Sequence, residues 1–242
     1  MEEKLITIGE AAEMMGVSID TLRRMDEDGR FPAIRQGEKG YRYYSKKDIH
    51  IYLSDLLKIA REWISKSNMV LPAQFYCSNS AVFQSRLGEL QDSLGKVTDE
   101  NIKKIFPLVV AVAGEIGDNS FAHNIGNWPD TPGIFFGFDI SKRQVVLADR
   151  GQGIFTTLKR VRPELQDDGQ ALKMAFTEVV SGRAPEERGN GLKFVRAVVT
   201  KSLLSLYFQT GNAELDLERD STELHIKKSN HNFRGCIALI TF

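Results

Sequence analysis

The amino-acid sequence predicts an α+β protein in two parts, and three features support this prediction. Apolar residues recur at helical spacing in the first 66 residues, around one short basic stretch. Helical and strand-like stretches then follow one another to the end of the chain without an internal repeat. Hydrophobic residues make up 42% of the 242 residues, which is enough to bury a sizeable core.

Charge and composition exclude several classes of protein. The 32 Lys and Arg residues equal the 32 Asp and Glu residues, so the chain is not globally basic and a nucleic-acid surface must be a local patch. The longest apolar run, residues 105–117, is shorter than the roughly 18 to 20 residues of a membrane-spanning helix. The start Met1-Glu2-Glu3-Lys4 is unlike a secretory signal, and Cys77 and Cys236 lack neighbours typical of a metal site. We therefore expect a cytoplasmic protein with reduced thiols and no membrane contact.

Two short helices are predicted at the beginning of the chain. Residues 7–15 have helical spacing, and Thr7 followed by Glu10 forms a capping box. Ser18 is suited to cap a second helix that ends by Gly29. The sequence therefore predicts two helices joined by a tight turn.

A basic hairpin and a third helix are expected next. Residues 30–47 contain six basic side chains and one acid, a local charge of +5 in a neutral protein, and their Gly and Pro residues favour a hairpin. A broad apolar face predicts a helix over residues 48–64. Polar residues and a proline interrupt the pattern over residues 66–72. We therefore predict domains at residues 1–66 and 67–242.

The second part is predicted to alternate between helices and strands. Helices are expected over residues 83–94, 100–121, 171–180 and 189–203. Strands are expected over residues 134–139, 144–148, 204–210, 222–227 and 236–242, with a further one at 214–217.

Three polar residues are spaced to share one face of the helix over residues 100–121 and its continuation. Glu115, Asn119 and His123 are four residues apart, so they lie on successive turns of one face. Taken alone, a solvated helix face is the alternative interpretation. His123 has the further alternative of a hydrogen bond within the core.

Two glycine motifs follow at the ends of predicted elements. Asp149 ends a strand, and Gly151 and Gly153 after it allow backbone to approach a ligand closely. Gly189 and Gly191 begin a helix, where free N–H groups favour a phosphate. Each motif is weak evidence by itself.

In this order, the three motifs resemble the nucleotide-binding boxes of the GHKL ATPase superfamily over residues 75–242, most closely those of the anti-sigma-factor serine kinases. The resemblance implies a Bergerat α/β sandwich with a mixed, mostly antiparallel sheet, and ATP and Mg²⁺ as cofactors. It implies that Glu115 is the general base, that Asn119 binds Mg²⁺ and that Asp149 accepts a hydrogen bond from the adenine amine. Gly151 and Gly153 would line the adenine pocket.

The resemblance also assigns a phosphate end and a lid. The residues between Gly153 and Gly189 match the superfamily's ATP lid, from which arginines would reach the γ-phosphate. The remaining nucleotide-binding residues implied are His123, Asn124 on the phosphate side, Ile154 as an apolar wall, Arg183, Arg188, Gly189, Asn190, Gly191 and Leu192. Residues 57–105 contain no histidine, unlike the phosphoacceptor segment of a sensor histidine kinase. A phosphoryl acceptor would therefore lie on another protein.

The first 55 residues resemble the winged helix-turn-helix of the MerR and excisionase-like families. The matching segments are residues 8–12, 17–24, 40–44 and 48–49. The resemblance implies groove contacts from the second helix and backbone contacts from the wing. The implied DNA-binding residues are Ser18, Thr21, Arg23 and Arg24 in the helix, and Arg35, Lys39, Tyr41, Arg42 and Tyr43 in the wing.

This resemblance has one departure and one alternative. Arg24-Met25-Asp26 stands where MerR activators carry two aromatic residues, which is nearer the excisionase-like branch. The acids Asp26, Glu27 and Asp28 are expected to face away from DNA. The alternative is a winged helix that binds protein.

Together the two resemblances predict a cytosolic transcriptional regulator that binds double-stranded DNA and carries a Mg·ATP-binding module. ATP binding would then be coupled to DNA binding. One alternative is a serine/threonine protein kinase of the anti-sigma type that phosphorylates a separate partner. Another is a slow ATPase or a dimerisation switch, for which a homodimer would suit a palindromic operator.

Overall fold

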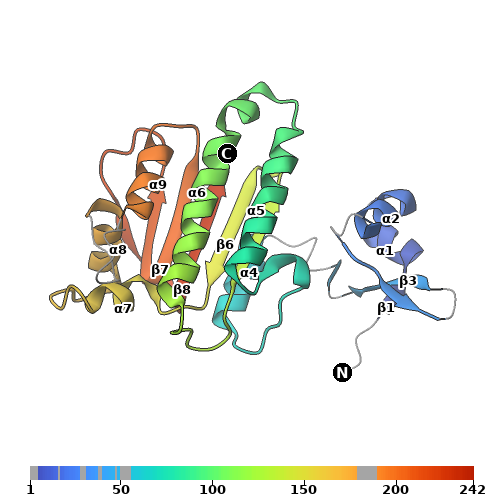
Figure 1. Ribbon diagram of the computed structural model, residues 1–242, viewed down its shortest axis with the longest axis horizontal. Coiled ribbons are helices and arrows are strands. Elements are labelled where there is room, and N and C mark those ends of the chain that lie inside the picture. The colour runs from blue at the N-terminus through green and yellow to red at the C-terminus, as the bar shows by residue number, and fades with distance from the viewer. Residues whose placement is uncertain are drawn as a thin grey trace. The chain divides into compact units, whose positions relative to one another are not determined.

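The chain folds into two units, each built around its own β-sheet. The computed structural model describes residues 5–15, 17–27, 31–37, 40–46, 48–49, 56–178 and 190–242 (Figure 1). Contacts between Cα atoms divide the chain into Met1–Ile59 and Ala60–Phe242. This division lies inside helix α4, Leu56–Ser65, whereas the boundary predicted between residues 66 and 67 lies just after that helix.

The first unit contains two helices and a small antiparallel sheet. Its elements are β1 Leu5–Thr7, α1 Ile8–Met15, α2 Ile19–Glu27, β2 Ile34–Gln36 and β3 Tyr41–Ser45, with the strands in the order β1-β3-β2. Thr7 accepts from the Glu10 backbone N–H, while Glu10 accepts from the Thr7 N–H at 2.8 Å, so the predicted capping box is confirmed. Buried Leu22, Met25 and Tyr44 hold the helices against the sheet.

Strand β1 was not expected from the sequence, which predicted a helix starting at Thr7. Thr7 pairs with Tyr43 of β3, and the helix begins one residue later at Ile8. A strand of three residues is too short for an alternating pattern to be visible. The helix predicted over residues 48–64 is present as α4 from Leu56 onward, and residues 50–55 lie outside the described residues.

The second unit is a five-stranded antiparallel sheet with helices on both faces. Its elements after α4 are η1 Ala73–Phe75, β4 Tyr76–Cys77, α5 Ser80–Gly95, α6 Glu100–Asn124, β5 Ile134–Asp139, β6 Gln144–Asp149, α7 Gly153–Lys159, α8 Asp168–Thr177, α9 Gly191–Thr200, β7 Ser205–Leu217 and β8 Ile226–Thr241. The strand order is β4-β5-β6-β8-β7. Every described pair is antiparallel, so the parallel pair of a mixed sheet is not found among the described strands.

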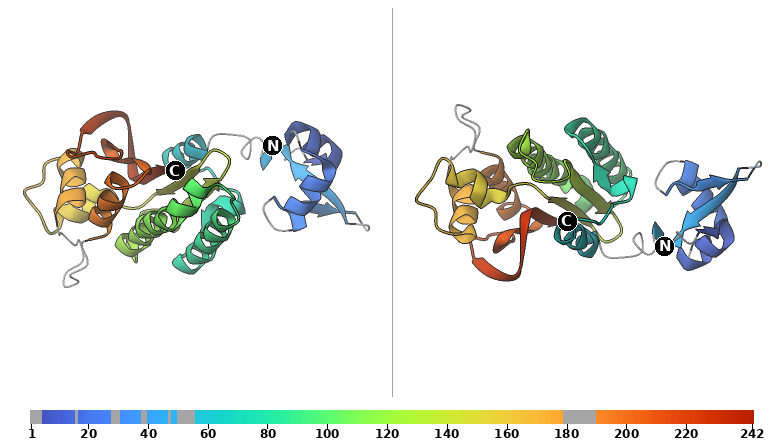
Figure 2. Two further views of the ribbon diagram at one scale, coloured as in Figure 1. Left: turned by 90° about the horizontal axis from the view of Figure 1, so that it is seen from above. Right: turned by 90° about the horizontal axis from the view of Figure 1, so that it is seen from below.

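Alternation of side chains along the strands builds two packed layers. On one face Phe136 meets Phe83 of α5 edge to face at 5.3 Å, and this core also takes in α6, α8 and α9. On the other face Phe135 stacks on Phe75 at 5.3 Å. Residues 60–65 of α4 cover this second face, opposite α5 and α6 (Figure 2). Successive side chains of a strand therefore alternate between the face covered by α5 and α6 and the face covered by α4.

The carboxyl-terminal strands are longer than predicted. The runs over 204–210 and 214–217 form one strand, β7, with irregular pairing at Gly211. The run over 236–242 belongs to β8, which begins at Ile226, so the strand predicted over 222–227 is wrong for its first four residues. Gly211 and Gly235 have φ of +54° and +95°, conformations that glycine allows within a bulged strand. The predicted strands stop at residue 210 and start at residue 236, so each glycine lies just outside a predicted strand.

Helices α7 and α8 lie between β6 and α9, where only one helix, over residues 171–180, was predicted. Helix α7 was not predicted, because seven residues are too few for a clear helical period. Asp167 caps α8, because its Oδ1 accepts from Gln170 N at 2.8 Å. The helix therefore begins at Asp168, three residues before its predicted start.

Helix α6 is, among the described residues, long and apolar enough to cross a membrane by length and composition alone. The sequence analysis expected no membrane-spanning helix, because the longest uninterrupted apolar run is too short. The mean hydropathy of the helix is nevertheless high, because a mean tolerates scattered polar residues. Val109, Val112 and Ala113 of this helix are buried in the core shared with α5 and the sheet.

Candidate functional site

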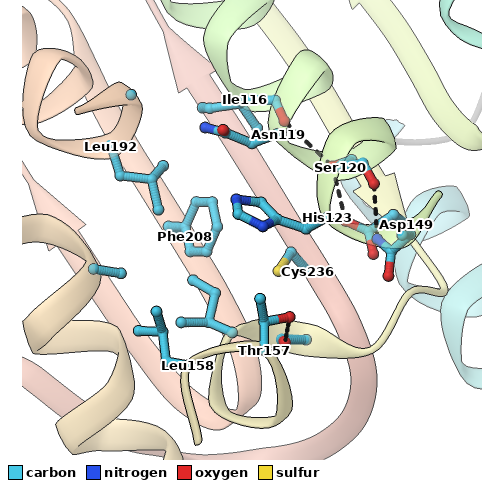
Figure 3. A pocket seen from close by; sticks show the side chains of 15 residues that line it. Ile116, Asn119, Ser120, His123, Asp149, Thr157, Leu158, Leu192, Phe208 and Cys236 are labelled. Atoms are coloured by element: carbon cyan, nitrogen blue, oxygen red, sulfur yellow. Dashed lines mark hydrogen bonds between the residues drawn. The ribbon is translucent and has the colours of Figure 1, made fainter. Parts of the chain in front are cut away.

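A pocket in the second unit lies between α6, the starts of α7 and α9, and strands β7 and β8. Its cavity volume is about 100 Å³, within about 790 Å³ of space that includes the open mouth. Its wall is mostly apolar, with a few polar groups that converge on it (Figure 3). The lining residues are Ile116, Asn119, Ser120, His123, Asn124, Asp149, Gly153, Ile154, Thr157, Leu158, Ala175, Gly191, Leu192, Phe208 and Cys236.

Asp149 lies at one end of this pocket, where β6 ends. Its side chain is held from two sides, because Ser120 Oγ donates to Oδ2 and Gly151 N donates to Oδ1, each at 2.8 Å. The residue is only 2% exposed. Burial raises the pKa of Asp149 to about 6, although the Ser120 hydroxyl and the Gly151 N–H act to lower it. The carboxylate is therefore oriented and largely desolvated.

The turn after Asp149 is packed tightly against the end of α6. Asn124 Oδ1 accepts from Gln152 N at 2.8 Å, and Asn124 Nδ2 donates to Ser120 O at 2.7 Å. A Cβ at Gly151 would come within 2.1 Å of the Asn124 side chain, so only glycine fits there. Asn124 therefore lies at the Asp149 end of the pocket, where its Oδ1 holds the turn and its Nδ2 is bonded to the α6 backbone.

Glu115 and Asn119 lie toward the other end of the pocket, beside the start of α9. A Cβ at Gly191 would come within 2.7 Å of Glu115 Oε2 and 2.8 Å of Asn119 Nδ2. The α9 backbone thus lies directly against this carboxylate and amide. His123, one turn beyond Asn119, also lines the pocket (Figure 3).

The pocket brings together most of the predicted site residues that the structure describes. Arg183, Arg188 and Gly189 lie outside the described residues. Gly153, with φ of +77°, lies where a Cβ would meet Thr210 Oγ1 at 3.3 Å. Asn190 directly precedes α9 and is exposed, and Glu115 adjoins the pocket through Gly191.

Sequence reasoning missed several pocket residues. Ser120 follows Asn119 directly, yet no motif marked it as the donor to Asp149. Phe208 and Cys236 come from β7 and β8, and Cys236 reaches the pocket because it pairs with Asp149 in the sheet. No local spacing could indicate these strand residues, since the register of β6 with β8 places Cys236 and the register of β8 with β7 places Phe208. The missed residues are Ile116, Ser120, Thr157, Leu158, Ala175, Phe208 and Cys236.

The first unit holds the second candidate site, on α2 and the β2–β3 hairpin. Ser18 Oγ accepts from Thr21 N at 3.1 Å, so Ser18 caps α2 as predicted. Ser18, Thr21, Arg23 and Arg24 are all half-exposed or exposed. In the hairpin, Tyr41 is exposed, whereas Lys39 lies outside the described residues.

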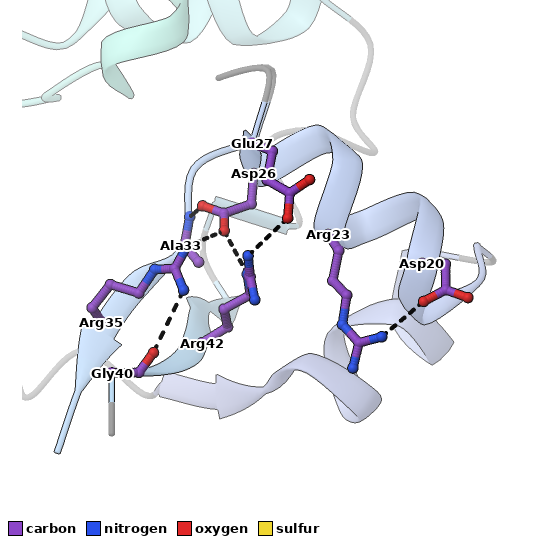
Figure 4. A network of polar contacts seen from close by, with 8 residues as sticks. All are labelled: Asp20, Arg23, Asp26, Glu27, Ala33, Arg35, Gly40 and Arg42. Carbon is purple, nitrogen blue, oxygen red and sulfur yellow. Dashed lines mark hydrogen bonds and ion pairs between the residues drawn. The ribbon is translucent and has the colours of Figure 1, made fainter. Parts of the chain in front are cut away.

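A buried carboxylate connects α2 to the hairpin (Figure 4). Asp26 accepts from Ala33 N at 2.8 Å, from Arg35 at 2.6 Å and from Arg42 Nε at 2.5 Å, with its side chain 7% exposed. Partial burial acts to raise the pKa of Asp26, but the Ala33 N–H and the two arginines lower it overall. Glu27 also pairs with Arg42 at 3.2 Å.

This network changes the expected charge of the wing. Asp26 and Glu27 were expected only to face away from DNA, but they pair with two of the basic residues assigned to DNA. Arg23 is likewise paired, with Asp20 at 2.8 Å. The local charge of +5 is therefore partly neutralised within the unit. The sequence did not predict this, because the acids of α2 lie outside residues 30–47. Asp28 lies outside the described residues.

The comparison with known families supports the interpretation of the first unit. Residues 7–44 match the family described as MerR family regulatory protein. This stretch contains α1, α2, β2 and most of β3. The comparison with curated proteins gives no match to the chain. The amino-terminal part of the chain is therefore a MerR-family helix-turn-helix domain, which supports a DNA-binding transcriptional regulator.

Proposed function

We propose that this protein is a cytoplasmic DNA-binding regulator whose second unit binds Mg·ATP as a GHKL-type module, with nucleotide binding coupled to DNA binding. One observation carries the ATP part of the proposal. Three segments far apart in the sequence line one pocket, with Asp149 buried at one end and Glu115 and Asn119 against the start of α9 at the other.

The Asp149 end of the pocket suits an adenine ring. The carboxylate is held by Ser120 and Gly151, and it can accept a hydrogen bond from an exocyclic amine. Ile154, Leu158 and Phe208 provide apolar wall, which suits the flat faces of a base. The orientation of Asp149 before any ligand binds reduces the cost of ordering it.

The Glu115 and Asn119 end suits Mg²⁺ with phosphate. Carboxylate and amide oxygens are hard ligands, and Mg²⁺ in nucleotide sites keeps waters and phosphate oxygens as its other ligands. The described residues contain no cluster of three or more His, Cys, Asp or Glu side chains that could hold a metal ion. When bound with the nucleotide, the ion would supply positive charge beside the phosphates. Backbone N–H groups at the start of α9 favour the same phosphates.

The MerR-family domain provides the DNA-binding part of the proposal. Helix α2 would enter the major groove with Ser18, Thr21, Arg23 and Arg24. The hairpin would contact phosphates through Arg35, Lys39, Tyr41, Arg42 and Tyr43. A homodimer would present two such domains to a palindromic site.

Titration of Mg·ATP into the wild-type protein and Asn119→Ala tests the nucleotide site. We expect calorimetry to show that wild type binds Mg·ATP and that the variant binds it with about 10- to 100-fold lower affinity. The variant lacks the side-chain amide that is proposed to contact the charged Mg²⁺ and phosphates. Adenosine, which lacks phosphates, should bind both proteins alike. Asn101→Ala, exposed near the start of the same helix, is the matched control. Equal Mg·ATP affinity in wild type and Asn119→Ala would contradict the proposed role of Asn119, and absence of binding to wild type would overturn the ATP proposal.

Salt dependence tests the wing. Arg42→Ala should weaken binding to DNA duplexes of randomised sequence by the same factor for every sequence. It should also lower the slope of log affinity against log salt concentration by about one. The guanidinium keeps N–H groups beyond those paired with Asp26 and Glu27, and its side chain is 23% exposed. Lys103→Ala, a paired and exposed lysine of the second unit, is the control. An unchanged slope in Arg42→Ala, or an equal change in Lys103→Ala, would remove Arg42 from the DNA interface.

A further inference from the structure

Arg150 follows Asp149 directly, and its side chain lies on the other face of the sheet, where α4 packs. It is 3% exposed. Its Nε donates to Trp63 O at 2.8 Å, and its terminal nitrogens reach three further carbonyl oxygens. Those further acceptors are Lys66 O, Ser67 O and Met69 O. One buried guanidinium therefore contacts four carbonyl groups.

These carbonyls belong to the end of α4 and the residues that follow it. Trp63 lies in the last turn of α4, where carbonyl groups have no partner within the helix and the helix dipole is negative. The guanidinium also lies 4.6 Å from the centroid of the Trp63 ring. Arg150 thus caps α4, and its planar fork of donors suits several carbonyls at once.

The turn that carries Arg150 also fixes the pocket. Gly151 N–H holds the Asp149 carboxylate, and Gln152 N–H is held by Asn124. Gly151 has no room for a side chain. Because consecutive residues of a tightly packed turn cannot move independently, the position of the Asp149 carboxylate and that of the Arg150 guanidinium are linked.

We propose that Arg150 couples occupancy of the Asp149 end of the pocket to the docking of the α4 carboxyl end. This inference rests on the proposed nucleotide site. A ligand that donates to Asp149 favours the turn geometry in which Arg150 caps α4, so binding increases the capped population. Coupling is reciprocal, so the capped end of α4 raises affinity for the ligand by the same factor. Helix α4 connects the MerR-family domain to the sheet in sequence, which makes it a route for regulation.

Hydrogen exchange with and without saturating Mg·ATP tests this coupling. In wild type we expect Mg·ATP to slow exchange over residues 63–69 by about fivefold or more. In Arg150→Met this segment should exchange fast in both conditions, and calorimetry should show Mg·ATP affinity reduced by a similar factor. Arg150→Lys keeps the charge but not the fork, and serves the same test if Arg150→Met fails to fold. Arg196→Met, which removes a donor to the Thr222 carbonyl, should behave as wild type.

Each contrary outcome is distinct. Calorimetric binding to wild type without slower exchange over residues 63–69 would overturn the coupling and leave the ATP proposal intact. Slower exchange that persists in both Arg150 variants would overturn the role of Arg150. No binding to wild type would overturn the ATP proposal and this inference with it.

Discussion

Asp149→Asn is expected to weaken ATP binding by about 1 to 3 kcal/mol and at the same time to stabilise the fold near neutral pH. The amide would direct a donor toward the adenine amine, where the carboxylate offers an acceptor. The variant would no longer bury a charge that is only 2% exposed. Calorimetry and denaturant unfolding measure the two effects separately.

The pH dependence gives the sign of the second effect. Burial raises the folded-state pKa of Asp149 from 3.8 to about 6, so the folded protein holds this proton more tightly than the unfolded chain. Asp149 therefore favours folding below about pH 4, and this contribution, up to about 3 kcal/mol, is lost as the pH rises through about 6. The difference in unfolding free energy between Asp149→Asn and wild type should grow over that window.

Asp139 is a suitable control, because its pKa is lowered in the folded protein whereas that of Asp149 is raised. Partial burial acts to raise its pKa, but the Ser141 hydroxyl and the Lys142 N–H lower it overall. Its contribution is therefore present above about pH 4 and lost only at lower pH. Asp139→Asn should leave the slope between about pH 4 and 7 unchanged. The same slope in Asp149→Asn as in wild type would mean that Asp149 is not desolvated as described.

Asp26→Ala is expected to open the hairpin of the MerR-family domain, at a cost of about 2 to 3 kcal/mol. The substitution leaves the Ala33 N–H and two guanidinium groups without their shared acceptor. Hydrogen exchange over β3 in the full chain measures this opening. DNA binding should weaken as well, because Arg35 and Arg42 lose the contact that positions them.

Asp20→Ala is the matched control, because Asp20 also pairs with an arginine of α2 but is 80% exposed. An exposed pair of this kind contributes only about 0.5 kcal/mol. Equal exchange over β3 in wild type and Asp26→Ala would show that the network does not hold the hairpin. A loss in Asp20→Ala as large as that in Asp26→Ala would mean that burial does not set the difference.

Features that depend on local spacing could be predicted from the sequence. The capping box of Thr7 and Glu10, the cap at Ser18 and the shared face of Glu115, Asn119 and His123 all follow from the geometry of one helix. These residues are at most eight positions apart, so no knowledge of the rest of the fold is needed. The two-helix start and the basic hairpin also follow from local patterns, and the MerR family match agrees with them.

Features that depend on strand register or on packing between elements could not be predicted. Long β7 and β8 looked like separate short runs, because bulged glycines resemble strand ends when partners are unknown. Asp26 accepts from Arg42, which is 16 residues away, and this pairing requires the hairpin to fold back on α2.

The sequence by itself determined which residue types recur at helical spacing and where the glycine motifs stand. Only the tertiary structure decided that Ser120 orients Asp149, that Cys236 lies opposite Asp149 in the sheet, and that Arg150 caps α4. The physical reason is that helix spacing is set by local backbone geometry, whereas these contacts depend on which distant segments the sheet and core bring together.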